Sequence, residues 1–166
     1  MTATRIIPAT EQEISVILEM IRALAQYEGL SHEVTATEER LRKTLFGPKP
    51  AAEVVLAYQG LECAGYALFF PTYSTFLAQP GIYLEDLYVQ PELRGRGIGV
   101  ALLRHVAKLA TERDCARVEW GVLNWNQPSI EFYERLGAAP LNDWTKYRLT
   151  GEALEGLAVR NNNGGL

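Results

Sequence analysis

The most constraining feature of this sequence is a strand-like segment that runs through a glycine-rich loop into an amphipathic segment. Ile82 to Val89 (IYLEDLYV) has the aliphatic and aromatic content of a strand. Pro91 to Val100 (PELRGRGIGV) then holds three glycines and two arginines. The next stretch, from about Ile98 to Arg113, predicts a helix whose apolar face is formed by Leu102, Leu103, Val106 and Leu109. This order predicts an α/β protein with a functional loop at a helix start.

A glycine loop before a helix has two interpretations. The free amides at a helix N-terminus bind phosphate groups, and glycines let the ligand approach the backbone. A cluster of glycines is equally consistent with a simple tight turn. Two nucleotide-binding motifs are excluded by spacing. A P-loop needs GxxxxGK[ST], and the glycines at 95, 97 and 99 give GxGxG where a dinucleotide fingerprint needs GxGxxG.

Length and charge bound the class of protein. We expect a single domain over residues 1–158 and a disordered tail over residues 159–166, since 166 residues suit one core and the chain closes on NNNGGL. The net charge of −4 argues against nucleic acid as a partner and favours a cationic one. No apolar run reaches the roughly 18 residues of a membrane span, and no secretory leader is evident, so we expect no membrane partner and a cytoplasmic location.

The cysteines and histidines show no metal-binding pattern. Cys63 and Cys115 lie far apart without a CxxC motif, which predicts two buried thiols and neither zinc nor a disulfide framework. His32 and His105 have no partner at ligand spacing, so we interpret both as structural or surface residues. No metal is expected.

The other elements follow from capping residues and periodicity. A helix is expected from the capping box at Thr10–Glu13 to Gly29. The remaining predictions are strands at 4–8, 53–59, 63–73, 116–123 and 144–149, and helices at 37–46 and 128–136.

The spacing Arg94-x-x-Gly97-x-Gly99 resembles the [R/Q]-x-x-G-x-[G/A] signature of the GNAT superfamily of N-acetyltransferases, and the element order over residues 4 to 150 is similar as well. The resemblance implies one mixed, mostly antiparallel sheet of about six to seven strands, splayed between strands 4 and 5 and flanked by about four helices. It also implies acetyl-CoA as the acyl donor. The donor would contact strand 4, the glycine loop, the start of the helix that follows the loop, and the start of the helix expected at 128–136. The residues are Leu87, Tyr88, Val89, Arg94, Gly95, Arg96, Gly97, Ile98, Gly99, Val100, Asn126 and Ser129.

Three separate segments resemble the diamine and polyamine branch of this superfamily and its thialysine-acetylating relatives. They are YLEDLYVQPELRGRGIG, NWNQPSIEFYERLGA and QYEGL. That resemblance implies a small cationic amine as substrate and a homodimer. Near Asp143-Trp144-Thr145 the chain departs from the polyamine enzymes, which favours shorter amines or aminoalkyl amino acids. The substrate side would comprise Tyr27, Glu28, Glu85, Glu119, Trp120 and Gly121.

Glu85 and Tyr133 have side chains that suit the chemistry of amine acetylation. An alkylammonium with a pKa near 10.4 must lose a proton before it attacks, and the resemblance makes Glu85 a substrate-side carboxylate that can accept it. Strict alternation would put Glu85 on one face with Tyr83, Leu87 and Val89, and Asp86 on the opposite face as a natural control. Tyr133 aligns with the tyrosine that protonates the leaving sulfur in this family, and its phenol pKa of about 10 is close to that of a thiol.

The sequence therefore predicts an acetyl-CoA-dependent N-acetyltransferase that acts on a small primary amine by direct transfer in a ternary complex, with Tyr133 and Glu85 as its catalytic residues. Two alternatives stay open. One is an acetyltransferase for protein lysines or N-termini, and the other is a non-catalytic acyl-CoA-binding module.

Overall fold

The computed structural model describes residues 3–159 of the chain. It divides into two compact units, one that runs to Gly121 and one that begins at Val122. The single domain expected over residues 1–158 stays a prediction. Of the predicted tail, Val159 is the last residue of a helix and residues 160–166 lie outside the described residues.

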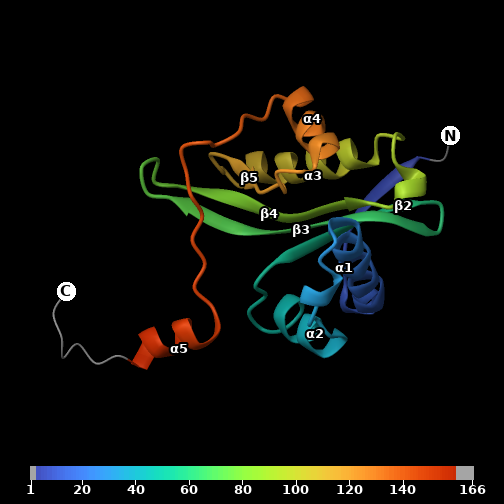
Figure 1. Cartoon of the computed structure of the whole chain (residues 1–166). Coiled ribbons are helices and arrows are strands. Elements are labelled where there is room, and N and C mark those ends of the chain that lie inside the picture. Colours follow the sequence, from blue (N-terminus) through green and yellow to red (C-terminus); the bar gives the residue numbers. More distant parts are fainter. Residues whose placement is uncertain (1–2, 160–166) are drawn as a thin grey trace. The chain divides into compact units, whose positions relative to one another are not determined.

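A five-stranded sheet forms the centre of the first unit, with the strands in sequence order (Figure 1). Neighbours from β1 to β4 pair antiparallel, whereas β4 and β5 are parallel. The sheet is therefore mixed and mostly antiparallel, as expected, but the described residues form five strands where the sequence predicted six to seven. The bounds are β1 Thr4–Pro8, β2 Glu53–Gln59, β3 Glu62–Ser74, β4 Gln79–Val89 and β5 Val118–Trp120.

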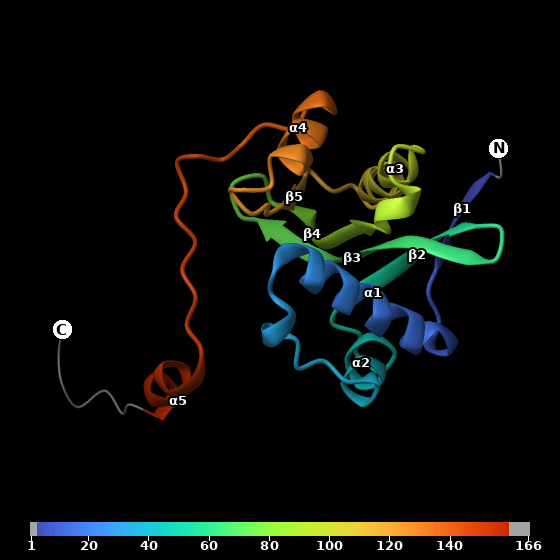
Figure 2. The same ribbon diagram turned by 45° about the vertical axis from the view of Figure 1, so that its right-hand side comes forward.

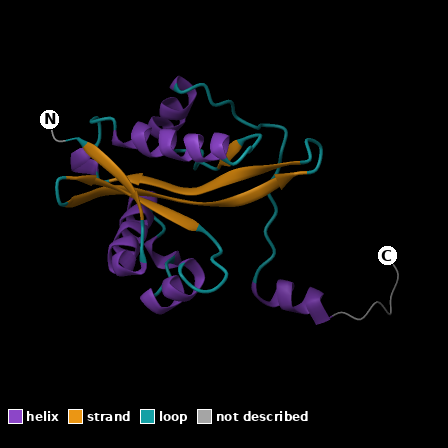
Figure 3. Ribbon diagram, turned by 180° about the vertical axis from the view of Figure 1, so that it is seen from behind, coloured by secondary structure: helices purple, strands orange, loops and turns teal. Residues whose placement is uncertain are grey.

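Helices cover both faces of this sheet (Figures 1 and 3). Helices α1 (Ile14–Glu28) and α2 (Glu38–Leu45) lie on one face, and α3 (Ile98–Glu112) lies on the other. The predicted capping box forms at Thr10, although a 3-10 turn over Glu11–Glu13 precedes α1. Gly29 ends α1 in the left-handed conformation, with φ of 73°. Short 3-10 turns also occur at Ser31–Glu33 and Pro91–Leu93.

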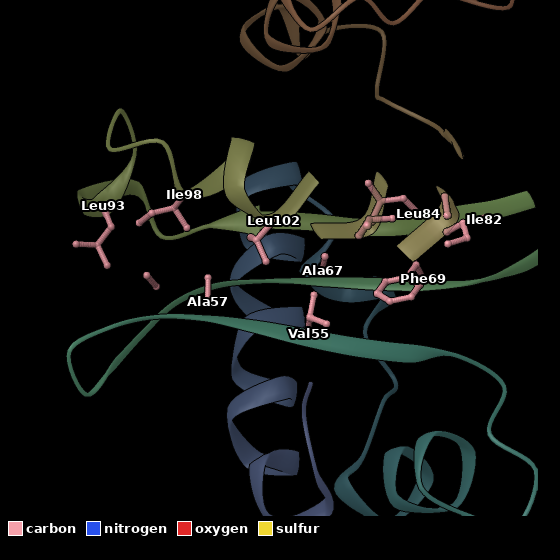
Figure 4. Packing of buried hydrophobic residues seen from close by; sticks show 12 residues of the cluster. Val55, Ala57, Ala67, Phe69, Ile82, Leu84, Leu93, Ile98 and Leu102 are labelled. Carbon is pink, nitrogen blue, oxygen red and sulfur yellow. The ribbon is translucent and has the colours of Figure 1, made fainter. Parts of the chain in front are cut away.

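The α3 side of the sheet holds one apolar core, in which side chains of β2, β3 and β4 pack against the helix (Figure 4). Burial of each large aliphatic or aromatic side chain contributes roughly 1.5–3 kcal/mol to folding. A second core under α1 and α2 includes the fully buried Tyr66 and the 5% exposed Tyr88. The labelled members of the first core are Val55, Ala57, Ala67, Phe69, Ile82, Leu84, Leu93, Ile98 and Leu102.

At its centre, strand β4 has one residue more than the segment of β3 with which it pairs. Leu68 of β3 is opposite Asp86, and the next residue, Phe69, is opposite Leu84, so Glu85 has no counterpart. This is a β-bulge, in which an added residue bends the strand and changes the alternation of its side chains.

The bulge overturns the predicted face of β4. Ile82 and Leu84 pack into the core under α3 before the bulge, and Leu87 and Val89 pack against that same core after it. The predicted common face of Tyr83, Glu85, Leu87 and Val89 is therefore wrong, because the side-chain period shifts by one residue at Glu85.

The second unit contains α4 (Gln127–Arg135), close to its predicted bounds, and α5 (Gly151–Val159), which the sequence analysis did not predict (Figure 2). The described residues therefore form five α-helices where about four were expected. The predicted strand at 144–149 is wrong, since this segment is irregular, and the strand expected at 116–123 shortens to Val118–Trp120. A strand needs a hydrogen-bonded neighbour, and the described residues 122–159 supply none.

Candidate functional site

The end of β4 leaves one backbone edge without a neighbouring strand among the described residues. On that edge β5 pairs only with Ile82, Tyr83 and Leu84. Strand β4 continues to Val89, still paired with β3 on its other edge. Apart from the Val89 carbonyl, which accepts from Arg94, the backbone groups of residues 85–89 that point away from β3 can therefore pair with an extended ligand.

The loop after β4 presents backbone at the start of α3. Gly95 and Gly97 have φ of 74° and 79°, which L side chains rarely adopt, and a Cβ built on either would meet nothing within 4 Å. Leu93 and Ile98, with 8% and 1% exposure, anchor the two sides of the loop in the core. An anchored loop with open glycines at the start of a long helix fits a pyrophosphate group.

Both arginine side chains of the loop bind the protein itself. The Arg94 Nε donates to the Val89 carbonyl at 3.0 Å, and its guanidinium lies 4.3 Å from the ring centroid of Tyr27. Arg96 donates to the Glu92 carbonyl at 3.2 Å and to Gln59 Oε1 at 3.5 Å. Backbone amides are thus the groups in this loop best placed to contact phosphate.

Asp86 lies half-buried on the α1 side of the sheet. The Tyr66 hydroxyl donates a hydrogen bond to its Oδ2 at 2.8 Å, and the Tyr66 side chain is fully buried in the second core. Burial raises the pKa of Asp86 to about 6, although the bond from Tyr66 acts in the opposite direction. Asp86 is therefore unsuitable as the passive control that the sequence analysis expected.

Two further carboxylates act on Asp86. Glu85 is the exposed residue of the bulge, and Glu28 ends α1. The negative charges of both raise the pKa of Asp86 further, and burial raises the pKa of Glu28 itself. Three carboxylates that repel one another are stabilised by a cation bound among them.

Strand β5 contributes Glu119 and Trp120, and Gly121 follows directly after it. The Glu119 carboxylate forms an ion pair with Arg117, with 2.8 Å between Oε2 and Nε. An arginine partner reduces the negative charge that this carboxylate presents, so Glu119 attracts a cation less strongly than Glu28, Glu85 or Asp86 does.

The second unit holds the other predicted residues. Asn126 is 4% exposed and caps α4, where its side chain accepts from the Ser129 amide at 3.4 Å. Tyr133 is half-buried in the same helix, with the Phe132 ring edge-on at 5.2 Å between centroids. Asn126 is thus the N-cap of α4, and its contact with the donor stays a prediction.

The first unit thus brings together residues from three separate segments: Tyr27 and Glu28 from α1, Glu85 from β4 and Arg94 from the loop. The sequence does not reveal the role of Tyr66, because nothing in the run CAGYALFF marks a hydroxyl that will donate to a carboxylate on the next strand, 20 residues later. The two cysteines are half-buried rather than fully buried. In residues 3–159 no three His, Cys, Asp or Glu side chains cluster as metal ligands would.

Comparison with protein families identifies the fold. Residues 18–138 match the acetyltransferase (GNAT) family, a range that includes the glycine loop, the carboxylates and Tyr133. The chain belongs to the GNAT family of acetyltransferases. The family and the enzyme class expected from the Arg94-x-x-Gly97-x-Gly99 spacing are thereby confirmed.

Several relatives of this GNAT acetyltransferase carry specific names. The chain is 40% identical to the thialysine N-epsilon-acetyltransferase of Mus musculus, over 96% of this chain and 100% of that one. It is 31% identical to the L-ornithine N5-acetyltransferase NATA1 of Arabidopsis thaliana, over 93% and 87% of the two chains. A solved integron cassette protein from V. cholerae has a TM-score of 0.81 at 24% identity, over 96% and 99%, which confirms the fold. No helix within the described residues has the length and hydropathy to span a membrane.

Proposed function

We propose that this acetyltransferase moves an acetyl group from acetyl-CoA to a primary amine of a small molecule, namely a diamine, a polyamine or an aminoalkyl amino acid such as thialysine. The observation that carries the proposal is the group of three carboxylates, Glu28, Glu85 and Asp86, because a small ammonium compound is the ligand that such a group favours. The names of relatives at 31% to 40% identity, a thialysine and an L-ornithine acetyltransferase, support the same class of acceptor.

The donor would lie along β4 and the loop. Bound acetyl-CoA supplies a thioester whose carbonyl carbon is open to attack by an amine. The amides of Gly95 to Val100 would hold its pyrophosphate, and the open edge of β4 at Leu87 and Val89 would pair with its pantetheine arm. Asn126 and Ser129 would contact the same ligand. The Val89 amide would stabilise the negative charge that develops on the carbonyl oxygen.

Two side chains, Glu85 and Tyr133, would exchange protons with the substrates. Glu85 takes a proton from the substrate ammonium, and the neutral nitrogen forms the C–N bond as the C–S bond breaks. Tyr133 would give its phenolic proton to the departing sulfur, and the second proton, which the nitrogen loses as it becomes an amide, would return to the Tyr133 phenolate. Asp86 and Glu28 hold the ammonium near Glu85 by charge. Direct transfer of this kind needs both substrates bound at once.

A panel of amines tests the acceptor. We expect thialysine, ornithine and short diamines to give a kcat/KM at least about tenfold higher than lysine-containing peptides, because only small ammonium compounds can approach all three carboxylates. Release of free thiol measures turnover. Higher activity on peptides would favour the protein-acetylating alternative, and acetyl-CoA binding without turnover on any amine would favour the non-catalytic module.

A substitution in the same assay tests the proton acceptor. Glu85→Gln should lower kcat/KM about tenfold or more at pH 7 and much less near pH 10, where a large fraction of the amine is already neutral. Glu62→Gln is the matched control, since Glu62 is an exposed strand glutamate outside the carboxylate group. A loss that is equal at both pH values would remove Glu85 from proton transfer.

We also propose a homodimer. The described part of the second unit exposes large apolar side chains, including Trp144 at 76% and Tyr147 at 94%, and such exposure is typical of association surfaces. Light scattering should give twice the chain mass at micromolar concentration. A monomer mass throughout the micromolar range would contradict the proposal.

A further inference from the structure

Arg94 makes three contacts that reach two other elements. Its Nε donates to the Val89 carbonyl at the end of β4. Its guanidinium carbon lies 4.3 Å from the ring centroid of Tyr27 in α1 and 5.8 Å from that of Tyr88 in β4. The planar guanidinium therefore joins the glycine loop to the last turn of α1 and to the strand that precedes the loop.

These contacts are specific to arginine. A planar guanidinium can lie over a ring and still donate from its edge, whereas a lysine ammonium is a compact point charge. The positive charge of Arg94 also acts on Tyr88, whose pKa is raised by burial and lowered by this neighbour. A role in phosphate binding alone would not require Arg94 to contact Val89, Tyr27 or Tyr88.

Arg94 connects two segments, the glycine loop and the end of α1, that would bind different substrates. The loop lies on the donor side, whereas Tyr27 and Glu28 close α1 beside Asp86. We propose that Arg94 is a positioning residue that couples donor binding to the position of the α1 end, and hence to amine binding. Donor binding orders the loop, Arg94 holds Tyr27, and Tyr27 fixes Glu28. The coupling itself is independent of the acceptor, and only its effect on the amine KM rests on the proposed function.

Hydrogen exchange tests the coupling without catalysis. The amides of Gly29 and Leu30 bond to Gln26 and Ala25 at the end of α1. In wild-type protein we expect acetyl-CoA to slow exchange in the peptide that contains them by about fivefold, because a ligand that orders one site stabilises whatever is coupled to it. Arg94→Lys should remove this protection and should speed exchange there in the free protein.

Three variants separate the coupling from general destabilisation. Tyr27→Leu should reproduce the exchange behaviour of Arg94→Lys, and Tyr27→Phe, which keeps the ring, should retain more of the protection by acetyl-CoA than Tyr27→Leu does. Arg96→Lys changes the other arginine of the loop, which donates to Gln59 and Glu92, and should leave exchange of this peptide unchanged in the free protein. Protection by acetyl-CoA that persists in Arg94→Lys would overturn the proposal.

Kinetics with a truncated donor separate this role from phosphate binding. S-acetylpantetheine lacks the pyrophosphate, so a direct phosphate contact by Arg94 predicts that Arg94→Lys impairs only the reaction with acetyl-CoA. Positioning through Tyr27 predicts that the variant raises the amine KM about five- to tenfold with both donors. An amine KM that is unchanged with S-acetylpantetheine contradicts the positioning role. If the wild-type protein acetylates no small amine, the proposed function fails, and the exchange experiment still decides the coupling.

Discussion

Replacing Tyr133 by Phe is expected to lower kcat by about 100-fold or more while the Kd for acetyl-CoA stays within about twofold. Without the hydroxyl the sulfur must leave as a thiolate, whereas the phenyl ring keeps its edge-on packing on Phe132. Thiol release gives kcat, and calorimetry gives the affinity for acetyl-CoA.

A donor with a more acidic thiol provides the control for Tyr133. An aryl thioester leaves readily as a thiolate, so Tyr133→Phe should lose much less activity with it than with acetyl-CoA. Phe132→Leu changes the packing of the tyrosine ring but keeps its hydroxyl, and should lower kcat only modestly. Wild-type activity of Tyr133→Phe with acetyl-CoA would remove this side chain from the mechanism.

Asp86→Asn is expected to make the protein more stable above pH 6 and a poorer enzyme. The pKa of Asp86 is raised from 3.8 to about 6, so the folded state binds its proton more tightly than the unfolded state does. The ionised carboxylate therefore destabilises the fold, by at most roughly 3 kcal/mol for this shift. The penalty is absent below pH 3.8, grows as the pH rises and is complete above about pH 6. An asparagine at position 86 has no such penalty because its side chain does not ionise.

Urea unfolding at two pH values measures this effect. At pH 8 we expect Asp86→Asn to raise the free energy of unfolding by about 1–2 kcal/mol, and at pH 4 we expect little difference from wild type. Its kcat/KM for the preferred amine should fall about tenfold, because one of three carboxylates loses its charge. Tyr66→Phe is the matched variant: it removes the donor to the Asp86 carboxylate and should destabilise the protein at pH 8. An Asp86→Asn protein that is less stable than wild type at pH 8 would contradict this account.

Local signals in the sequence predict much of the fold. Strands β1 and β2 have their predicted bounds, since each is a short apolar run closed by turn residues. The Thr10 capping box and the end of α1 at Gly29 depend on residues within one turn of each other. The glycine loop leads into α3 for the same reason. These features need no information from distant parts of the chain.

Features that depend on a partner segment could not be predicted in this way. The strand expected at 144–149 has suitable residues, but the second unit offers it no neighbour. The bulge at Glu85 is defined by where β3 places Leu68 and Phe69, and the setting of Asp86 depends on the Tyr66 hydroxyl from that strand. Simple alternation along β4 therefore assigned Asp86 the wrong role.

The bulge in β4 also affects how this protein tolerates changes in length. A substitution at Glu85 alters an exposed side chain and leaves the backbone register intact. Deletion of that one residue would remove the bulge and still leave Asp86 opposite Leu68 and Leu87 opposite Ala67, so the side chains after it would keep their present faces. Loss of this position would therefore cost the strand its exposed carboxylate and its local bend, but not the packing of Leu87 and Val89 against the core.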